Sequence, residues 1–75
     1  MEVLAPDLGQ SGANVTIEAW FKKEGDTITK GEPMMEISNE KLNQEIEAPE
    51  SGVLKQIIVQ EGESVPPRTV VAIIE

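Results

Sequence analysis

Short runs of hydrophobic residues alternate with polar residues along this chain, and glycine, proline or acidic residues separate the runs. Met35 and Ile37 stand two positions apart, as do Ile46 and Ala48, while residues 70–74 are all aliphatic. A period of two is typical of β-strands, because successive side chains of a strand point to opposite faces. We therefore predict eight short strands, near residues 2–5, 15–23, 27–29, 33–38, 43–48, 53–60, 64–66 and 70–74.

The predicted strands form two similar halves. Residues 15–28 resemble residues 52–65, which lie 37 positions later. Residues 3–7 match residues 46–50, which lie 43 positions later, so the first half contains about six additional residues before Val15. This repeat predicts an all-β fold with quasi-two-fold internal symmetry: a flattened β-barrel, or barrel-sandwich hybrid, of two four-stranded antiparallel sheets.

In residues 34–48, local propensity disagrees with this pattern. The segment is rich in good helix formers, and Ser38 could cap a helix. Its alternation of apolar residues and its match to the aliphatic run 70–74 favour a hairpin instead. Pairing Met35 with Ile46 centres the turn on Glu40-Lys41, and pairing Met35 with Ala48 centres it on Lys41-Leu42. In either register Lys41 is a central turn residue, and its ammonium projects into solvent.

The composition excludes several classes of function. The chain has 75 residues, a formal net charge of −8, and neither cysteine nor histidine. This acidity disfavours nucleic acids and anionic membranes as partners, and no apolar run approaches the roughly 20 residues that span a bilayer. Without histidine or cysteine we predict no catalytic residues. Glu45, Glu47 and Glu50 could bind a metal in principle, but solvation of an exposed strand explains them better, so we predict no metal site.

Several motifs occur in a fixed order along the whole chain. Glu40-Lys41 at the predicted tip precedes a strand that ends in Glu-Ala-Pro-x-x-Gly-x-Leu, here residues 47–54. Residues 6–9 read Pro-Asp-Leu-Gly, and Glu-Gly-acid turns follow at 24–26 and 61–63. Together these motifs resemble the lipoyl domain of 2-oxo acid dehydrogenase complexes. The departures are Glu40 in place of the family's usual Asp, and Ser38-Asn39 in place of its acidic-Thr pair. The tip is similar to that of some bacterial pyruvate or acetoin complexes.

The resemblance implies that residues 1–75 are a single lipoyl domain, which we expect to come from a longer chain. It implies lipoic acid attached to Lys41 as N6-lipoyllysine by a lipoate ligase or lipoyl transferase. The lipoyl group would act as a swinging arm. It would accept an acyl group from a thiamine-dependent 2-oxo acid decarboxylase, pass it to the acyltransferase core, and be reoxidised by dihydrolipoamide dehydrogenase.

The resemblance also implies a monomeric, non-catalytic domain in a parent chain that is a dihydrolipoamide acyltransferase. We expect a cytoplasmic location if the source is bacterial, which we favour, or the mitochondrial matrix if it is eukaryotic.

Residues beside Lys41 are the expected recognition surface for the partner enzymes. The nearest are Asn39, Glu40, Leu42 and Asn43. The two-fold relation should bring the insertion of the first half close to the hairpin, and the matching loop of lipoyl domains influences recognition by the decarboxylase. Its residues are Leu8, Gly9, Gln10, Ser11, Gly12, Ala13 and Asn14. Because many of the acids lie in or after the hairpin, we expect basic rims on the partner active sites.

Two functions with the same fold remain as alternatives. A biotinyl carrier domain usually has methionine on both sides of its modified lysine, whereas Lys41 lies between Glu40 and Leu42. Biotinyl domains also tend to lack the long first loop. An unmodified scaffold module of this fold would leave the Glu40-Lys41 tip unexplained.

Overall fold

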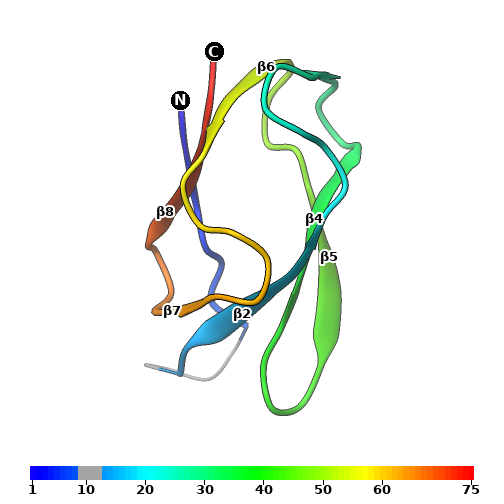
Figure 1. Ribbon diagram of the computed structural model, residues 1–75. Helices are drawn as coiled ribbons and strands as arrows, with labels where there is room; N and C mark the ends of the chain where they lie inside the picture. Colours follow the sequence, from blue (N-terminus) through cyan, green and yellow to red (C-terminus); the bar gives the residue numbers. More distant parts are fainter. Residues whose placement is uncertain (9–12) are drawn as a thin grey trace.

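The computed structural model describes residues 1–8 and 13–75, and all of its regular elements are β-strands (Figure 1). They are β1 (Glu2–Leu4), β2 (Val15–Trp20), β3 (Thr27–Ile28), β4 (Pro33–Ser38), β5 (Asn43–Glu47), β6 (Gly52–Ile57), β7 (Ser64–Val65) and β8 (Val70–Ile74). The eight strands predicted from the alternation are confirmed, although β2 and β6 end three residues earlier than predicted. In the part of the chain that the structure describes, no helix is long and apolar enough to cross a membrane.

The strands form two antiparallel sheets of four strands each. One sheet has the order β1-β8-β6-β3 and the other the order β5-β4-β2-β7. The predicted fold is confirmed in the form of a flattened sandwich, because the two sheets do not close into one barrel. The edge strands β3 and β7 have two residues each, and the longer edge strand β5 exposes Glu45 and Glu47. Short or charged edges resist pairing with other chains, so this small open fold protects its edges without closure.

The predicted internal symmetry extends to the strand registers. Leu4 pairs with Val70 in one half, and Glu47 pairs with Pro33 at the equivalent position in the other. Both pairs lie beside a register shift, and a second matched pair of shifts occurs at Glu18 of β2 and at Lys55 of β6. Such bulges increase the local twist of a strand. The two halves therefore share their irregularities as well as their strands.

Aliphatic and methionine side chains fill the space between the sheets. Those that are almost completely buried include Ile17, Ile37 and Leu54. Trp20 is half-buried against this core, and its indole N–H donates a hydrogen bond of 2.9 Å to the carbonyl oxygen of Val59. Tight packing of this core supports the sheets from which the loops and turns project.

The β4–β5 hairpin and the two chain termini lie at opposite ends of the molecule (Figure 1). The internal symmetry explains this arrangement, since β4 and β5 are equivalent to β8 and β1, the strands at the two termini. Where one half has the hairpin turn, the other half has the chain ends. The molecule extends over 31 × 19 × 18 Å, and the hairpin tip forms one end of it (Figure 1).

Candidate functional site

The β4–β5 hairpin presents Lys41 at its tip. Met35 pairs with Ile46 and Ser38 pairs with Asn43, so the turn is centred on Glu40-Lys41. This is the first of the two registers that the sequence allowed. Glu40, Lys41 and Leu42 are all exposed, as is Asn43 at the start of β5, whereas Asn39 is half-buried. The predicted position of the lysine in the turn is therefore confirmed.

Hydrogen bonds of Asn39 hold the tip together. The amide oxygen Oδ1 of Asn39 accepts the backbone N–H of Lys41 at 2.8 Å and that of Leu42 at 3.0 Å. The backbone N–H of Asn39 donates to the carbonyl oxygen of Leu42 at 2.9 Å. Asparagine side chains commonly accept N–H groups from the residues that follow them in turns. That tendency was the available sequence signal for this role, which was not predicted for Asn39.

The base of the hairpin is anchored on β2. Ser38 lies opposite Thr16 of β2 and is buried with 8% of its surface exposed. Its hydroxyl donates a hydrogen bond to the carboxylate of Glu18, which stands at the bulge of β2. In the other half, the equivalent positions are Lys55 and Glu75, which form an ion pair of 2.7 Å. Neither contact was predicted, although the offset of 37 positions that relates the halves also relates Ser38 to Glu75 and Glu18 to Lys55.

Among the described residues, Lys22 and Lys55 form ion pairs, whereas Lys41 does not. The Lys22 ammonium lies 3.5 Å from the Glu32 carboxylate, and Lys55 lies 2.7 Å from Glu75. Within residues 1–8 and 13–75, the Lys41 ammonium has neither a hydrogen bond nor an ion pair. Its amine is therefore accessible to an external reagent without the loss of a contact inside the described chain.

The acidic partners of those two ion pairs have lowered pKa values. The backbone N–H of Thr29 donates a hydrogen bond to the Glu32 carboxylate and lowers the pKa of Glu32. The charge of Lys22 lowers that pKa as well. The hydrogen bond and the charge of Lys55 lower the pKa of Glu75. A donated hydrogen bond and a nearby positive charge each stabilise the charged form of a carboxylate.

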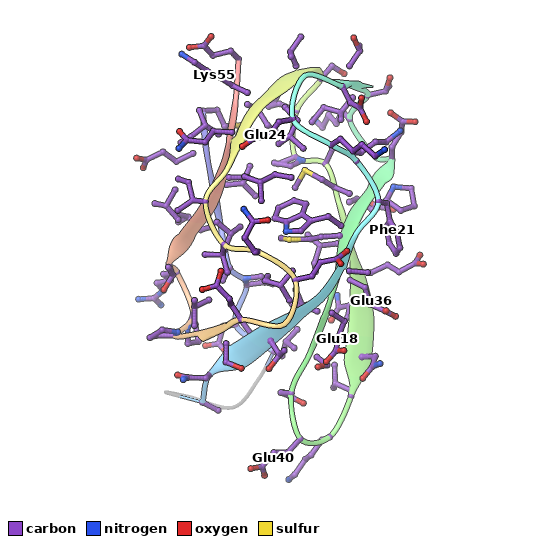
Figure 2. All side chains as sticks on the ribbon, viewed as in Figure 1. Glu18, Phe21, Glu24, Glu36, Glu40 and Lys55 are labelled. Carbon is purple, nitrogen blue, oxygen red and sulfur yellow. The ribbon has the colours of Figure 1, made fainter. Side chains whose placement is uncertain are left out.

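Acidic side chains surround the hairpin. Glu40 lies at the tip, and Glu18 and Glu36 lie along the flank of the molecule that leads to it (Figure 2). Glu36 of β4 is paired directly with Glu45 of β5. Because no lysine or arginine other than Lys41 stands in β4, β5 or the turn between them, this end of the sheet is negatively charged. A surface of this kind attracts basic partner surfaces.

The insertion of the first half was expected to lie close to the hairpin, and its last described residues lead into β2 beside the base of that hairpin. It ends at Asn14, and Thr16 two residues later is paired with Ser38 at the base of the hairpin. Leu8 is half-buried and packs on the hydrophobic core, Ala13 is half-buried, and Asn14 is exposed. The predicted recognition residues Gly9, Gln10, Ser11 and Gly12 lie outside the described residues. A recognition role for this loop stays a prediction.

The groove that the structure shows does not lie at Lys41. A surface groove of about 660 Å³ is lined by Trp20, Ile57 and their neighbours, none of which belongs to the hairpin. No group of three or more acidic residues among residues 1–8 and 13–75 is arranged to hold a metal ion. The candidate site is thus a protruding amine on a short turn.

Comparisons with known proteins point to one family. The chain matches, over residues 1–74, the biotin/lipoyl family model that is described as biotin-requiring enzyme. It is 45% identical to the dihydrolipoyllysine-residue acetyltransferase component of the acetoin cleaving system of Bacillus subtilis, over 99% of this chain and 19% of that protein. It is 36% identical to the dihydrolipoyllysine-residue succinyltransferase component of the 2-oxoglutarate dehydrogenase complex of Staphylococcus saprophyticus, over 97% of this chain and 17% of that protein.

A solved structure supports the same assignment. The lipoyl domain of the 2-oxoglutarate dehydrogenase complex from Azotobacter vinelandii superposes with a TM-score of 0.83 and 27% sequence identity. The match covers 100% of this chain and 95% of that domain. The chain thus spans about a fifth or less of the length of the two curated relatives, but nearly the full length of the solved domain.

Proposed function

The chain belongs to the biotin- and lipoyl-attachment family as a lipoyl domain, and we propose that Lys41 is the residue that carries its lipoyl group. The single observation that supports this choice is the position of Lys41 in the exposed turn of the β4–β5 hairpin, at the end of the molecule opposite the termini. A tethered carrier must reach into several active sites, and this is the end that is free to do so.

The residues around Lys41 fit an amide-linked arm. The attachment needs a primary amine that a modifying enzyme can reach, and the Lys41 ammonium is exposed and has no partner within the described residues. After losing a proton, the Lys41 nitrogen would form an amide bond with the activated carboxyl carbon of lipoate as the activating group leaves. This converts a charged side chain into a neutral one, so the tip becomes more acidic.

The bound lipoyl group would supply acyl and two-electron transfer through its dithiolane sulfurs. The chain contributes position and recognition. The sheet pairing up to Ser38 and Asn43 holds the base of the turn, while exposed Glu40 and Leu42 flank the arm and meet whatever active site the arm enters. The absence of cysteine from the sequence means that no internal thiol competes with the arm for disulfide exchange.

The partners we propose are those of an acyl carrier in a 2-oxo acid dehydrogenase complex. They are a thiamine-dependent decarboxylase, an acyltransferase core, dihydrolipoamide dehydrogenase, and a lipoate ligase or lipoyl transferase. The parent chain would be the dihydrolipoamide acyltransferase, because the relatives named above are such components. Both relatives are bacterial, which supports a cytoplasmic location.

Mass spectrometry of the chain after incubation with lipoate, ATP and a lipoate ligase tests the proposal. We expect the intact mass to rise by one lipoyl group, and Lys41→Arg to abolish the gain. Lys30→Arg is a matched control, because Lys30 is also exposed and lies in a turn, between β3 and β4. It should be modified like the unaltered chain. Modification of Lys41→Arg would show that another amine is the acceptor.

A biotin ligase distinguishes the alternative carrier function. We expect no biotin on the unaltered chain, because Glu40 and Leu42 stand where biotinyl domains have methionines. If the biotin ligase modifies Lys41 and the lipoate ligase does not, the cofactor assignment is wrong.

A further inference from the structure

We infer that Asn39 is a positioning residue for Lys41: its side chain holds the turn in the geometry in which the modifying ligase accepts the lysine. This inference rests on the proposed function of Lys41. It concerns a residue that does not itself react, and it is carried by the hydrogen bonds of the tip.

The part of the hairpin that can move is short. The β4–β5 ladder extends to the pair of Ser38 and Asn43, and Ser38 is also buried, paired with β2 and bonded to Glu18. Only residues 39–42 project beyond this ladder. The orientation of Lys41 is therefore decided within these four residues.

Within these residues, the side chain of Asn39 replaces the usual backbone acceptor. A common β-turn is closed by a hydrogen bond from the N–H of its fourth residue to the carbonyl oxygen of its first. Here Leu42, the fourth residue, donates its N–H to Oδ1 of Asn39, which also accepts the N–H of Lys41. No Gly follows Asn39 to favour a tight turn by backbone conformation alone. One side-chain oxygen thus orients the peptide groups of the lysine and of its neighbour.

Loss of the Asn39 acceptor should reduce the fraction of molecules in which the turn has the conformation that the ligase accepts. If a ligase binds only one conformation, the apparent affinity falls in proportion to the fraction of molecules in that conformation. Removing two such hydrogen bonds from an exposed turn should lower that fraction about tenfold. The effect belongs to binding, so KM for the domain should rise while kcat at saturation stays the same.

The test compares the unaltered chain with three variants in the lipoate ligase reaction. Asn39→Ala removes the acceptor. Asn39→Asp keeps an oxygen at the same position. Gln44→Ala is the matched control, since Gln44 is an exposed amide residue of the same hairpin whose side chain makes no hydrogen bond among the described residues and which is not among the expected recognition residues. In each reaction a lysine nitrogen–acyl bond forms, the acyl–AMP bond breaks and a proton is lost. Amide hydrogen exchange at Lys41 and Leu42 is measured on the unmodified chains.

We expect KM to rise about tenfold in Asn39→Ala with unchanged kcat, and to stay within about twofold in Asn39→Asp and Gln44→Ala. The exchange protection of the two amides should be lost only in Asn39→Ala, while all variants unfold at similar temperatures. Equal KM for Asn39→Ala and the unaltered chain would overturn the role of Asn39 alone. An unaltered chain that the ligase does not modify would instead overturn the proposed function and, with it, this inference.

Discussion

Gly52 at the start of β6 lies where the fold leaves no room for a side chain. A Cβ atom at this position would stand 2.7 Å from the carbonyl oxygen of Glu75 and 3.0 Å from a methyl carbon of Ile74. That carbonyl oxygen accepts the N–H of Val53 at 2.8 Å, and the N–H of Glu75 donates back to the carbonyl oxygen of Val53 at 2.9 Å. The closest obstacle is backbone, so in Gly52→Ala two backbone segments must move apart.

The cost of this movement follows from the contact. Insertion of a methyl group into a fully packed site costs about 1–3 kcal/mol, and a contact with hydrogen-bonded backbone should lie near the middle of that range. For a domain of this size, each kcal/mol shifts the melting temperature by about 4–8 °C. We therefore expect Gly52→Ala to lose about 2 kcal/mol and to melt about 8–16 °C lower than the unaltered chain.

Thermal unfolding followed by circular dichroism measures this shift. Gly62→Ala is the control, because a Cβ at Gly62 meets nothing within 4 Å and the substitution is penalised only by the backbone φ of +89°. That penalty is about 1–2 kcal/mol before any gain from a less flexible unfolded chain, so the control should melt above Gly52→Ala. A melting temperature of Gly52→Ala within about 2 °C of the unaltered chain would refute the steric reasoning.

Three further predictions concern the core, acid stability and docking. Leu54→Ala should lower the free energy of unfolding in urea by about 2–5 kcal/mol, because Leu54 is completely buried, and a loss below about 1 kcal/mol would contradict this packing. The interaction that lowers the pKa of Glu75 stabilises the fold above the ordinary carboxyl pKa, and this stabilisation is lost as the pH falls through the lowered pKa. On acidification from about pH 5 to pH 3, the free energy of unfolding should therefore fall less for Lys55→Met than for the unaltered chain. With a net charge of −8, reductive acylation of the lipoylated chain by its decarboxylase should show a kcat/KM that falls about tenfold between low and high salt, and a rate independent of ionic strength would refute the electrostatic part of the proposal.

The hairpin shows how far local pattern predicts this site. The alternation in residues 34–48 was sufficient to prefer strands over the helix that the individual propensities favour, because buried apolar positions two apart are worth more to the fold than helix propensity. The same alternation placed Lys41 in the turn in both allowed registers. It did not choose between the registers, because that choice depends on pairing across the turn and on Ser38 packing against β2.

The sequence by itself determined the eight strands, the two matching halves and the exposed turn that holds Lys41. These features follow from a period of two and from an internal repeat, both of which are properties of neighbouring positions along the chain. Tertiary structure alone decided that the sheets stay open as a sandwich, that Ser38 reaches Glu18, and that Asn39 closes the tip. The sheet order and the Ser38–Glu18 contact both bring together residues that are distant in sequence. Such contacts also fix the register of the hairpin, and the choice of Asn39 Oδ1 as acceptor depends on that register. All three features therefore exist only once the two sheets are packed.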